Sequence, residues 1–281
     1  MAWGQGRDLV RAMVLTSTRA IPGVTVDIIS DYDVIVYVRD VLPFYENREW
    51  LSSFGEVLAL YRDPLAKHDG FEETGFVVQF VGGLKIDFTI LPVEILTKIV
   101  QDQTLPAEYD AGYRVLLDKD HLAEGLPHPT YQAYIPKPPS QERFNEVIDS
   151  FFLNVTYVAR YLWRDDVLAA RAILEQYMKP EGLLTVLWWL VEIDHGWKVK
   201  PGLYGRGLRK WLRPDLWKDL EATCPNAEPK EIWKALEETL DLMRKAAHEV
   251  GMHFGFAYPE ERERLTREYI GGIHKLERGY P

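Results

Sequence analysis

Apolar residues in the first half of the chain come in short runs that indicate strands. The runs are rich in β-branched and aromatic side chains, which suit buried strands. They lie at residues 11–16, 32–38, 75–81, 84–91 and 114–117. Gly82 and Gly83 separate two of these runs and predict a hairpin turn. Large apolar side chains at roughly helical spacing predict a helix in part of residues 42–60. Residues 92–101 are predicted to form a second helix, with Pro92 at its first position.

The second half of the chain is helical in pattern throughout. Residues 125–139 hold five of the seventeen prolines, so this stretch cannot be a regular element and marks a domain boundary. Ser140 then predicts an N-cap. Helices are predicted over residues 144–175, 181–195, 208–220, 229–253 and 260–276. We therefore expect an α+β protein, with a mixed β-sheet flanked by helices in residues 1–135 and an all-α helical bundle in residues 136–281.

Composition and charge narrow the classes of function. The chain has 281 residues, with 33 Lys and Arg against 43 Asp and Glu, and a formal net charge of −10. An acidic chain is not expected to coat nucleic acid, which requires a basic face, and it suits cationic partners. The single cysteine, Cys224, excludes an intrachain disulfide. The first residues do not resemble a signal peptide, and the longest apolar run, residues 183–191, is too short to span a bilayer, so we expect a soluble, cytoplasmic protein.

Three aspartates on predicted strands are the candidate chemistry of the chain. Asp31 and Asp33 are two residues apart, so on a strand their side chains point to the same face. Two crowded carboxylates repel each other unless a cation lies between them, and Mg²⁺ typically takes one or two carboxylates together with substrate phosphates. Asp87 lies mid-strand among apolar residues, where an unpaired buried carboxylate would be costly. In the alternative, purely structural interpretation, Asp31 starts a turn, Asp33 acts as a cap and Asp87 faces solvent on an edge strand.

The arrangement of a hydroxyl-rich turn, then Asp-x-Asp, then a third strand carboxylate resembles the nucleotidyltransferase superfamily typified by DNA polymerase β. More closely, the chain resembles the aminoglycoside 6-adenylyltransferases, the streptomycin-modifying enzymes. The segments that carry this resemblance span nearly the whole chain in order: RAMVLTSTR (11–19), SDYDVIVYV (30–38), LKIDFTILPVE (84–94), YRVLLDKD (113–120), YVARYLWRDD (157–166) and IWKALEETLDLMRKAAHEV (232–250).

The resemblance implies a nucleotidyltransferase domain followed by a helical substrate-binding domain. It implies transfer of an adenylyl group from ATP to a hydroxyl of a cationic, streptomycin-type aminoglycoside, with release of pyrophosphate. Asp31 and Asp33 would bind Mg²⁺, and Asp87 would be a further metal ligand or the general base. Ser17, Thr18 and Arg19 would line the triphosphate.

The acceptor and the assembly are predicted less directly. Glu192 and Asp194 in the helical domain are candidates to bind the polycationic antibiotic; alternatively, they are two solvated carboxylates at the end of an amphipathic helix. We expect no nucleic-acid or membrane partner, and a monomer or homodimer. Two rival functions remain: a nucleotidyltransferase with a different acceptor, and a degenerate homologue that binds nucleotide or a cationic ligand without turnover.

The chain departs from the family pattern in two ways. The family has Asn-Gly-Ser-Arg where this chain has Thr16, Ser17, Thr18 and Arg19, so serine replaces a glycine beside the triphosphate. We expect Ser17 to keep a negative φ and the triphosphate to lie slightly further out. Family members also have a full helix before the first strand, where this chain has only about ten residues, so we expect a shortened or rearranged start.

Overall fold

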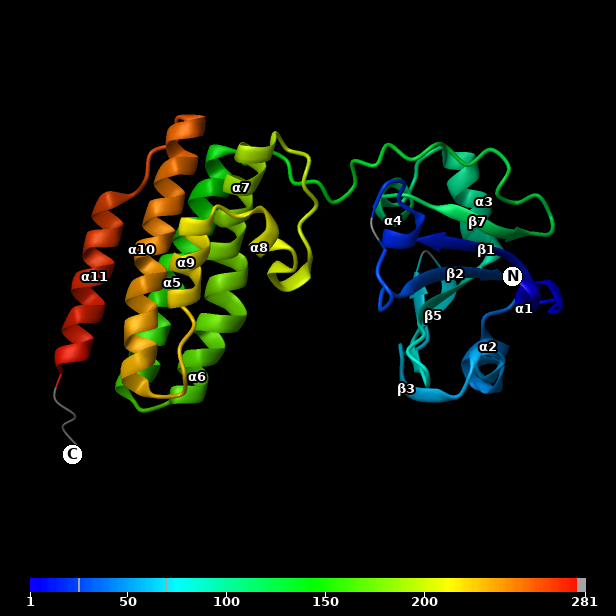
Figure 1. Ribbon diagram of the computed structural model, residues 1–281, viewed down its shortest axis with the longest axis horizontal. Helices are drawn as coiled ribbons and strands as arrows, with labels where there is room; N and C mark the ends of the chain where they lie inside the picture. Colours follow the sequence, from blue (N-terminus) through cyan, green and yellow to red (C-terminus); the bar gives the residue numbers. More distant parts are fainter. Residues whose placement is uncertain (25, 69, 277–281) are drawn as a thin grey trace. The chain divides into compact units, whose positions relative to one another are not determined.

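The computed structural model of the protein describes residues 1–24, 26–68 and 70–276 (Figure 1). The chain divides into two compact units, Met1–Tyr134 and Ile135–Pro281. The boundary expected from the proline-rich stretch lies one residue from this division. None of the helices in the three described ranges is long and apolar enough to cross a membrane.

The first unit is built on a mixed sheet of seven strands. The strands are β1 (Val10–Thr16), β2 (Tyr32–Val38), β3 (Val57–Arg62), β4 (Ala66–His68), β5 (Phe71–Phe80), β6 (Lys85–Pro92) and β7 (Arg114–Asp118). Their order is β3-β5-β6-β2-β1-β7, with β4 paired to β5. Only β2 and β6 are parallel among the paired strands in the described part of the chain. The sheet therefore has the mixed character that was predicted.

Short helices cover both faces of this sheet. They are α1 (Ala2–Gln5), η1 (Thr18–Ala20), α2 (Leu42–Glu46), η2 (Glu49–Phe54), α3 (Val93–Asp102) and α4 (Ala107–Asp110). Alternate residues of β2 enter two separate cores: Val34 and Val36 pack in the cluster that contains Phe44 of α2, whereas Ile35 and Tyr37 pack with Leu96 of α3. Figure 1 shows α2 and α3 on opposite sides of the strands.

Strands β3 and β4 were not predicted, and residues 42–60 were predicted only as partly helical. The helical part is limited to α2 and the 3₁₀ helix η2, and Leu58 lies in β3 rather than in a helix. The reason is visible in the burial of β3, whose residues are exposed or half-buried on both faces. A strand near the sheet edge lacks the clean alternation of buried and exposed residues by which sequence patterns reveal strands.

The described part of the second unit consists of helices and the loops that connect them. Its helices are α5 (Gln141–Trp163), α6 (Val167–Ala172), η3 (Ile173–Leu183, a π-helix), α7 (Leu184–His195), η4 (Leu203–Gly205), α8 (Leu208–Trp211), α9 (Pro214–Ala222), α10 (Pro229–Phe254) and α11 (Glu260–Lys275). The Ser140 cap is confirmed, since its hydroxyl accepts a hydrogen bond from the Arg143 N–H at 3.1 Å. The continuous helix predicted over residues 144–175 is wrong: it breaks before α6, where Asp165 has a φ of 67° that an α-helix cannot contain.

Candidate active site

The aspartates of the predicted cluster lie side by side on one face of the sheet. Asp33 of β2 pairs directly with Asp87 of β6 in the parallel register, and Asp31 precedes Asp33 by two residues. This face is the one that carries Ile35 and Tyr37, because side chains alternate along β2. Strand β6 lies between β5 and β2, so the alternative that places Asp87 on an edge strand is wrong.

Lys85 joins this cluster and was not among the predicted site residues. Its Nζ lies 2.8 Å from Asp31 Oδ2 and 2.7 Å from both carboxylate oxygens of Asp87. Burial lowers the pKa of Lys85, but the hydrogen bonds and charges of the two aspartates outweigh burial and bring its pKa above the usual value. The signal in the sequence is the spacing Lys85-x-Asp87, which puts the ammonium and the carboxylate on the same strand face.

Asp33 is the aspartate that the ammonium does not contact directly. Desolvation raises the pKa of Asp33, the negative charge of Asp31 raises it further, and a hydrogen bond from Ser17 lowers it in part. The charge of Asp87 also raises this pKa. An added cation near Asp33 would therefore relieve a repulsion that Lys85 leaves only partly balanced.

Ser17 forms the turn between β1 and η1, and its backbone contradicts the expected negative φ. Its φ is 59° and its ψ is −157°, a combination that glycine adopts readily and that other residues rarely adopt. The turn is closed by the Ala20 N–H, which donates to the Ser17 carbonyl at 2.9 Å. The chain thus keeps a glycine-like turn although it carries a serine, and the cost is backbone strain rather than a displaced turn.

Thr18 and Arg19 follow in η1, and the Arg19 side chain hydrogen-bonds to the segment before β2. The guanidinium of Arg19 donates to the Ser30 carbonyl at 2.7 Å and to the Asp31 carbonyl at 2.9 Å. It also lies 3.9 Å over the ring centre of Tyr32. Arg19 therefore holds the backbone of Asp31 in place. A cavity of about 390 Å³ opens beside Arg19 and Lys85.

The carboxylates offer the oxygen ligands that Mg²⁺ prefers. Among the described residues, however, no three His, Cys, Asp or Glu side chains are arranged to hold a metal together. The Lys85 ammonium lies between Asp31 and Asp87 and pairs with both. The donor set fits a divalent cation bound by one or two aspartates and phosphate oxygens once the Lys85 ammonium moves away from Asp31.

Glu192 and Asp194 lie on α7 in environments that differ from each other. Glu192 is fully buried, and its carboxylate accepts a hydrogen bond from the Val199 N–H at 3.2 Å. Burial raises the pKa of Glu192, and backbone N–H groups lower it in part. Glu192 is therefore no solvated carboxylate, and its burial leaves it no surface to offer a ligand. Asp194 is partly exposed and lies 3.8 Å from Arg213; its role in acceptor binding stays a prediction.

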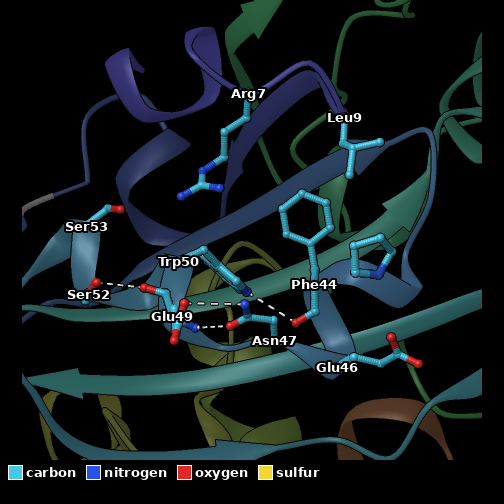
Figure 2. Close-up of a pocket in the computed structure, with 10 residues that line it drawn as sticks. Arg7, Leu9, Phe44, Glu46, Asn47, Glu49, Trp50, Ser52 and Ser53 are labelled. Atoms are coloured by element: carbon cyan, nitrogen blue, oxygen red, sulfur yellow. Dashed lines mark hydrogen bonds between the residues drawn. The ribbon is translucent and has the colours of Figure 1, made fainter.

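A cavity of about 690 Å³ lies on the opposite face of the sheet, between α2, η2 and the residues just before β1 (Figure 2). Its polar groups bond to one another: the Glu49 N–H donates to the Asn47 side chain at 2.8 Å, and the Ser52 hydroxyl donates to the Glu49 carbonyl at 2.7 Å. Phe44 and Trp50 line it and belong to the core that contains Val34 and Val36. This cavity is therefore separated from the aspartates by the sheet.

Comparison with known proteins places the chain in a family. The sequence model of the family described as Streptomycin adenylyltransferase matches residues 1–273. The chain belongs to the streptomycin adenylyltransferase family. Members of this family are nucleotidyltransferases, and the resemblance inferred from the sequence motifs is confirmed.

Individual relatives agree with this assignment. The chain is 28% identical to an aminoglycoside 6-adenylyltransferase of Bacillus subtilis, over 95% of this chain and 92% of that protein. It is 27% identical to a protein of the same name from Campylobacter jejuni, over 93% of this chain and 88% of that protein. The crystal structure of an aminoglycoside 6-adenyltransferase from Bacillus subtilis aligns with a TM-score of 0.50 and 23% identity, covering 98% of this chain and 95% of that one. This structure supports the fold.

Proposed function

We propose that this streptomycin adenylyltransferase family member transfers the adenylyl group of ATP to a hydroxyl of a streptomycin-type aminoglycoside and releases pyrophosphate. The observation that carries the proposal is the juxtaposition of Asp31, Asp33 and Asp87 on one sheet face, beside the Ser17 turn. The names of the relatives, aminoglycoside 6-adenylyltransferase, support the class of acceptor. The net charge of −10 suits a cationic acceptor.

The residues of the cluster divide the chemistry between them. Asp87 accepts the proton of the acceptor hydroxyl as the hydroxyl oxygen attacks the α-phosphorus of ATP. The bond between the α-phosphorus and the bridging oxygen breaks, and pyrophosphate leaves with that oxygen. Thr18 and Arg19 lie beside the Ser17 turn and are proposed to contact the triphosphate. Lys85 supplies a positive charge next to the reacting groups, where fixed charges stabilise a transition state most strongly.

Asp31 and Asp33 are proposed to hold Mg²⁺. When bound, the ion neutralises the phosphates and the leaving pyrophosphate. The raised pKa of Asp33 supports this assignment, since desolvation and the charges of its two aspartate neighbours disfavour its ionised form in the absence of a divalent cation.

A pyrophosphate-release assay on the full chain tests the proposal. Release is expected only with ATP, streptomycin and Mg²⁺ together, and it is expected to stop on chelation or in the Asp87→Asn variant. Release with another hydroxyl acceptor but not with streptomycin would favour a nucleotidyltransferase of different specificity. Calorimetric binding of ATP or streptomycin without any release would instead indicate a homologue that binds ligands without turnover.

A further inference from the structure

The face of the sheet that carries the aspartates is covered over only part of its width. Helices α3 and α4 cover this face of β1 and β2, where Ala12, Val14, Ile35 and Tyr37 pack with Leu96 and Tyr109. On the same face, Tyr61 of β3 is 61% exposed and Val77 of β5 is 38% exposed. An aromatic and an aliphatic side chain are thus presented on an open sheet surface.

The register connects this open surface to the candidate active site. Tyr61 of β3 lies opposite Val77 of β5, and Val77 lies opposite Asp87 of β6. Directly opposed residues share a face, so the three side chains form one row that continues to Asp33. Neighbouring strands are about 4.8 Å apart, which puts the backbone of Tyr61 about 10 Å from that of Asp87. A six-membered ring with its substituents spans this separation.

A carboxylate borders the same row. The backbone of Asp63 is held at both ends: its N–H donates to the Gly75 carbonyl at 2.9 Å, and its carbonyl accepts from the Thr74 hydroxyl at 3.0 Å. Its carboxylate lies over Gly75, where a Cβ would collide with it. Gly75 is the neighbour of Val77 on this face. Within the described ranges, the Asp63 carboxylate has no ion-pair partner.

We propose that this open face is the acceptor subsite of the adenylyl transfer, with Tyr61 and Asp63 as specificity-determining residues. The inference rests on the proposed function. Tyr61 and Val77 receive the apolar face of a sugar or cyclitol ring, and Asp63 binds an amino or guanidino substituent, while a hydroxyl of the ring reaches Asp87. A cationic occupant suits this face because the Asp63 and Asp87 carboxylates both lie on it, and Lys85 balances only the charge nearest to it. The same charges disfavour the triphosphate on this side of Asp87.

The test compares steady-state kinetics of the full chain and its variants with streptomycin and ATP. Tyr61→Ala is expected to raise the KM for streptomycin about tenfold, since a lost aromatic contact of this size has that effect, and to leave the KM for ATP unchanged. Tyr61→Phe keeps the ring and is expected to behave like the parent. Asp63→Asn is expected to raise the streptomycin KM about threefold or more at low salt, with less effect at high salt.

Two further variants separate position from charge. Gly75→Ala leaves the charge in place but pushes the Asp63 carboxylate aside, so it is expected to raise the streptomycin KM in the same direction as Asp63→Asn. Glu46→Gln removes an exposed carboxylate of the same unit on the opposite face, beside the cavity of Figure 2, and is expected to change neither KM. Thermal unfolding of each variant verifies the fold.

The outcomes are distinct. If the parent adenylylates streptomycin but the KM values of Tyr61→Ala and Asp63→Asn equal that of the control Glu46→Gln, the proposed acceptor subsite is overturned and the proposed function stands. A rise in the KM for ATP alone would assign the row to the nucleotide and overturn it as well. If the parent releases no pyrophosphate, calorimetric titration with streptomycin decides: weaker binding by Tyr61→Ala upholds the subsite, whereas equal binding, or none by the parent, overturns it.

Discussion

The strained turn at Ser17 allows a prediction whose parts can be measured separately. At a φ of 59° and a ψ of −157°, a residue with a Cβ is strained by about 1–3 kcal/mol, whereas glycine is not. Glycine has its own cost, since it loses about 0.4–1 kcal/mol more backbone entropy on folding than alanine. The variants Ser17→Gly and Ser17→Ala both lack the hydroxyl, so their difference reports the strain and this entropy alone.

The magnitude follows from these two effects. Ser17→Gly is expected to be more stable than Ser17→Ala by about 1 kcal/mol, which corresponds to about 3–4 °C in the melting temperature of a unit of this size. The parent is expected to be more stable than Ser17→Ala by about 0.5–1.5 kcal/mol, because alanine loses the interaction of the Ser17 side chain with Asp33 that lowers the pKa of that carboxylate. The parent and Ser17→Gly should therefore be similar in stability.

Thermal and urea unfolding of the three proteins, followed by fluorescence, measure these differences. Since the backbone of Ser17 already has glycine-like dihedral angles, Ser17→Gly is also expected to change the ATP dissociation constant by less than about threefold. It is not expected to gain the affinity of an additional hydrogen bond. An alanine variant as stable as the glycine variant would refute the strain. A tenfold gain in ATP affinity would show that the serine Cβ itself obstructs the nucleotide.

Three further outcomes are expected. Because the pKa of Asp33 is raised in the folded protein, the free energy of unfolding falls as pH rises from the ordinary aspartate pKa through the raised pKa. Asp33→Asn should therefore abolish turnover and have a higher melting temperature than the parent at pH 7 but not near pH 4. An equal gain at both pH values would contradict a raised pKa as its cause. Lys85→Met should have a lower melting temperature than the parent without metal, and Mg²⁺ should raise its melting temperature more than that of the parent in thermal-shift titrations. Equal stabilisation of both proteins by Mg²⁺ would show that Lys85 does not compete with the ion. The KM for streptomycin should rise between low and high NaCl, because exposed charges are screened over about 10 Å at 0.1 M; a KM independent of salt would point to an uncharged acceptor.

Much of the first unit could be predicted because local pattern and tertiary structure agree there. Strand β2 was predicted with its observed bounds, since a buried strand is continuously apolar. The hairpin at Gly82 and Gly83 was predicted because both positions take a positive φ that favours glycine. Strand β3 was missed because its exposed residues carry no such pattern.

The sequence alone determined the family, the alternation that puts Asp31 and Asp33 on one face, and the proline-rich stretch between the helical and sheet-containing halves. These features depend on neighbouring residues and on strand geometry, which repeats every two residues. Only the tertiary structure decided which distant side chains meet. Lys85 reaches Asp31 across a separation of 54 residues, and Tyr61 enters the row of Asp87 through two strand pairings. The burial of Glu192 and the φ of Ser17 were likewise decided by packing and loop closure, which depend on parts of the chain that no local pattern contains.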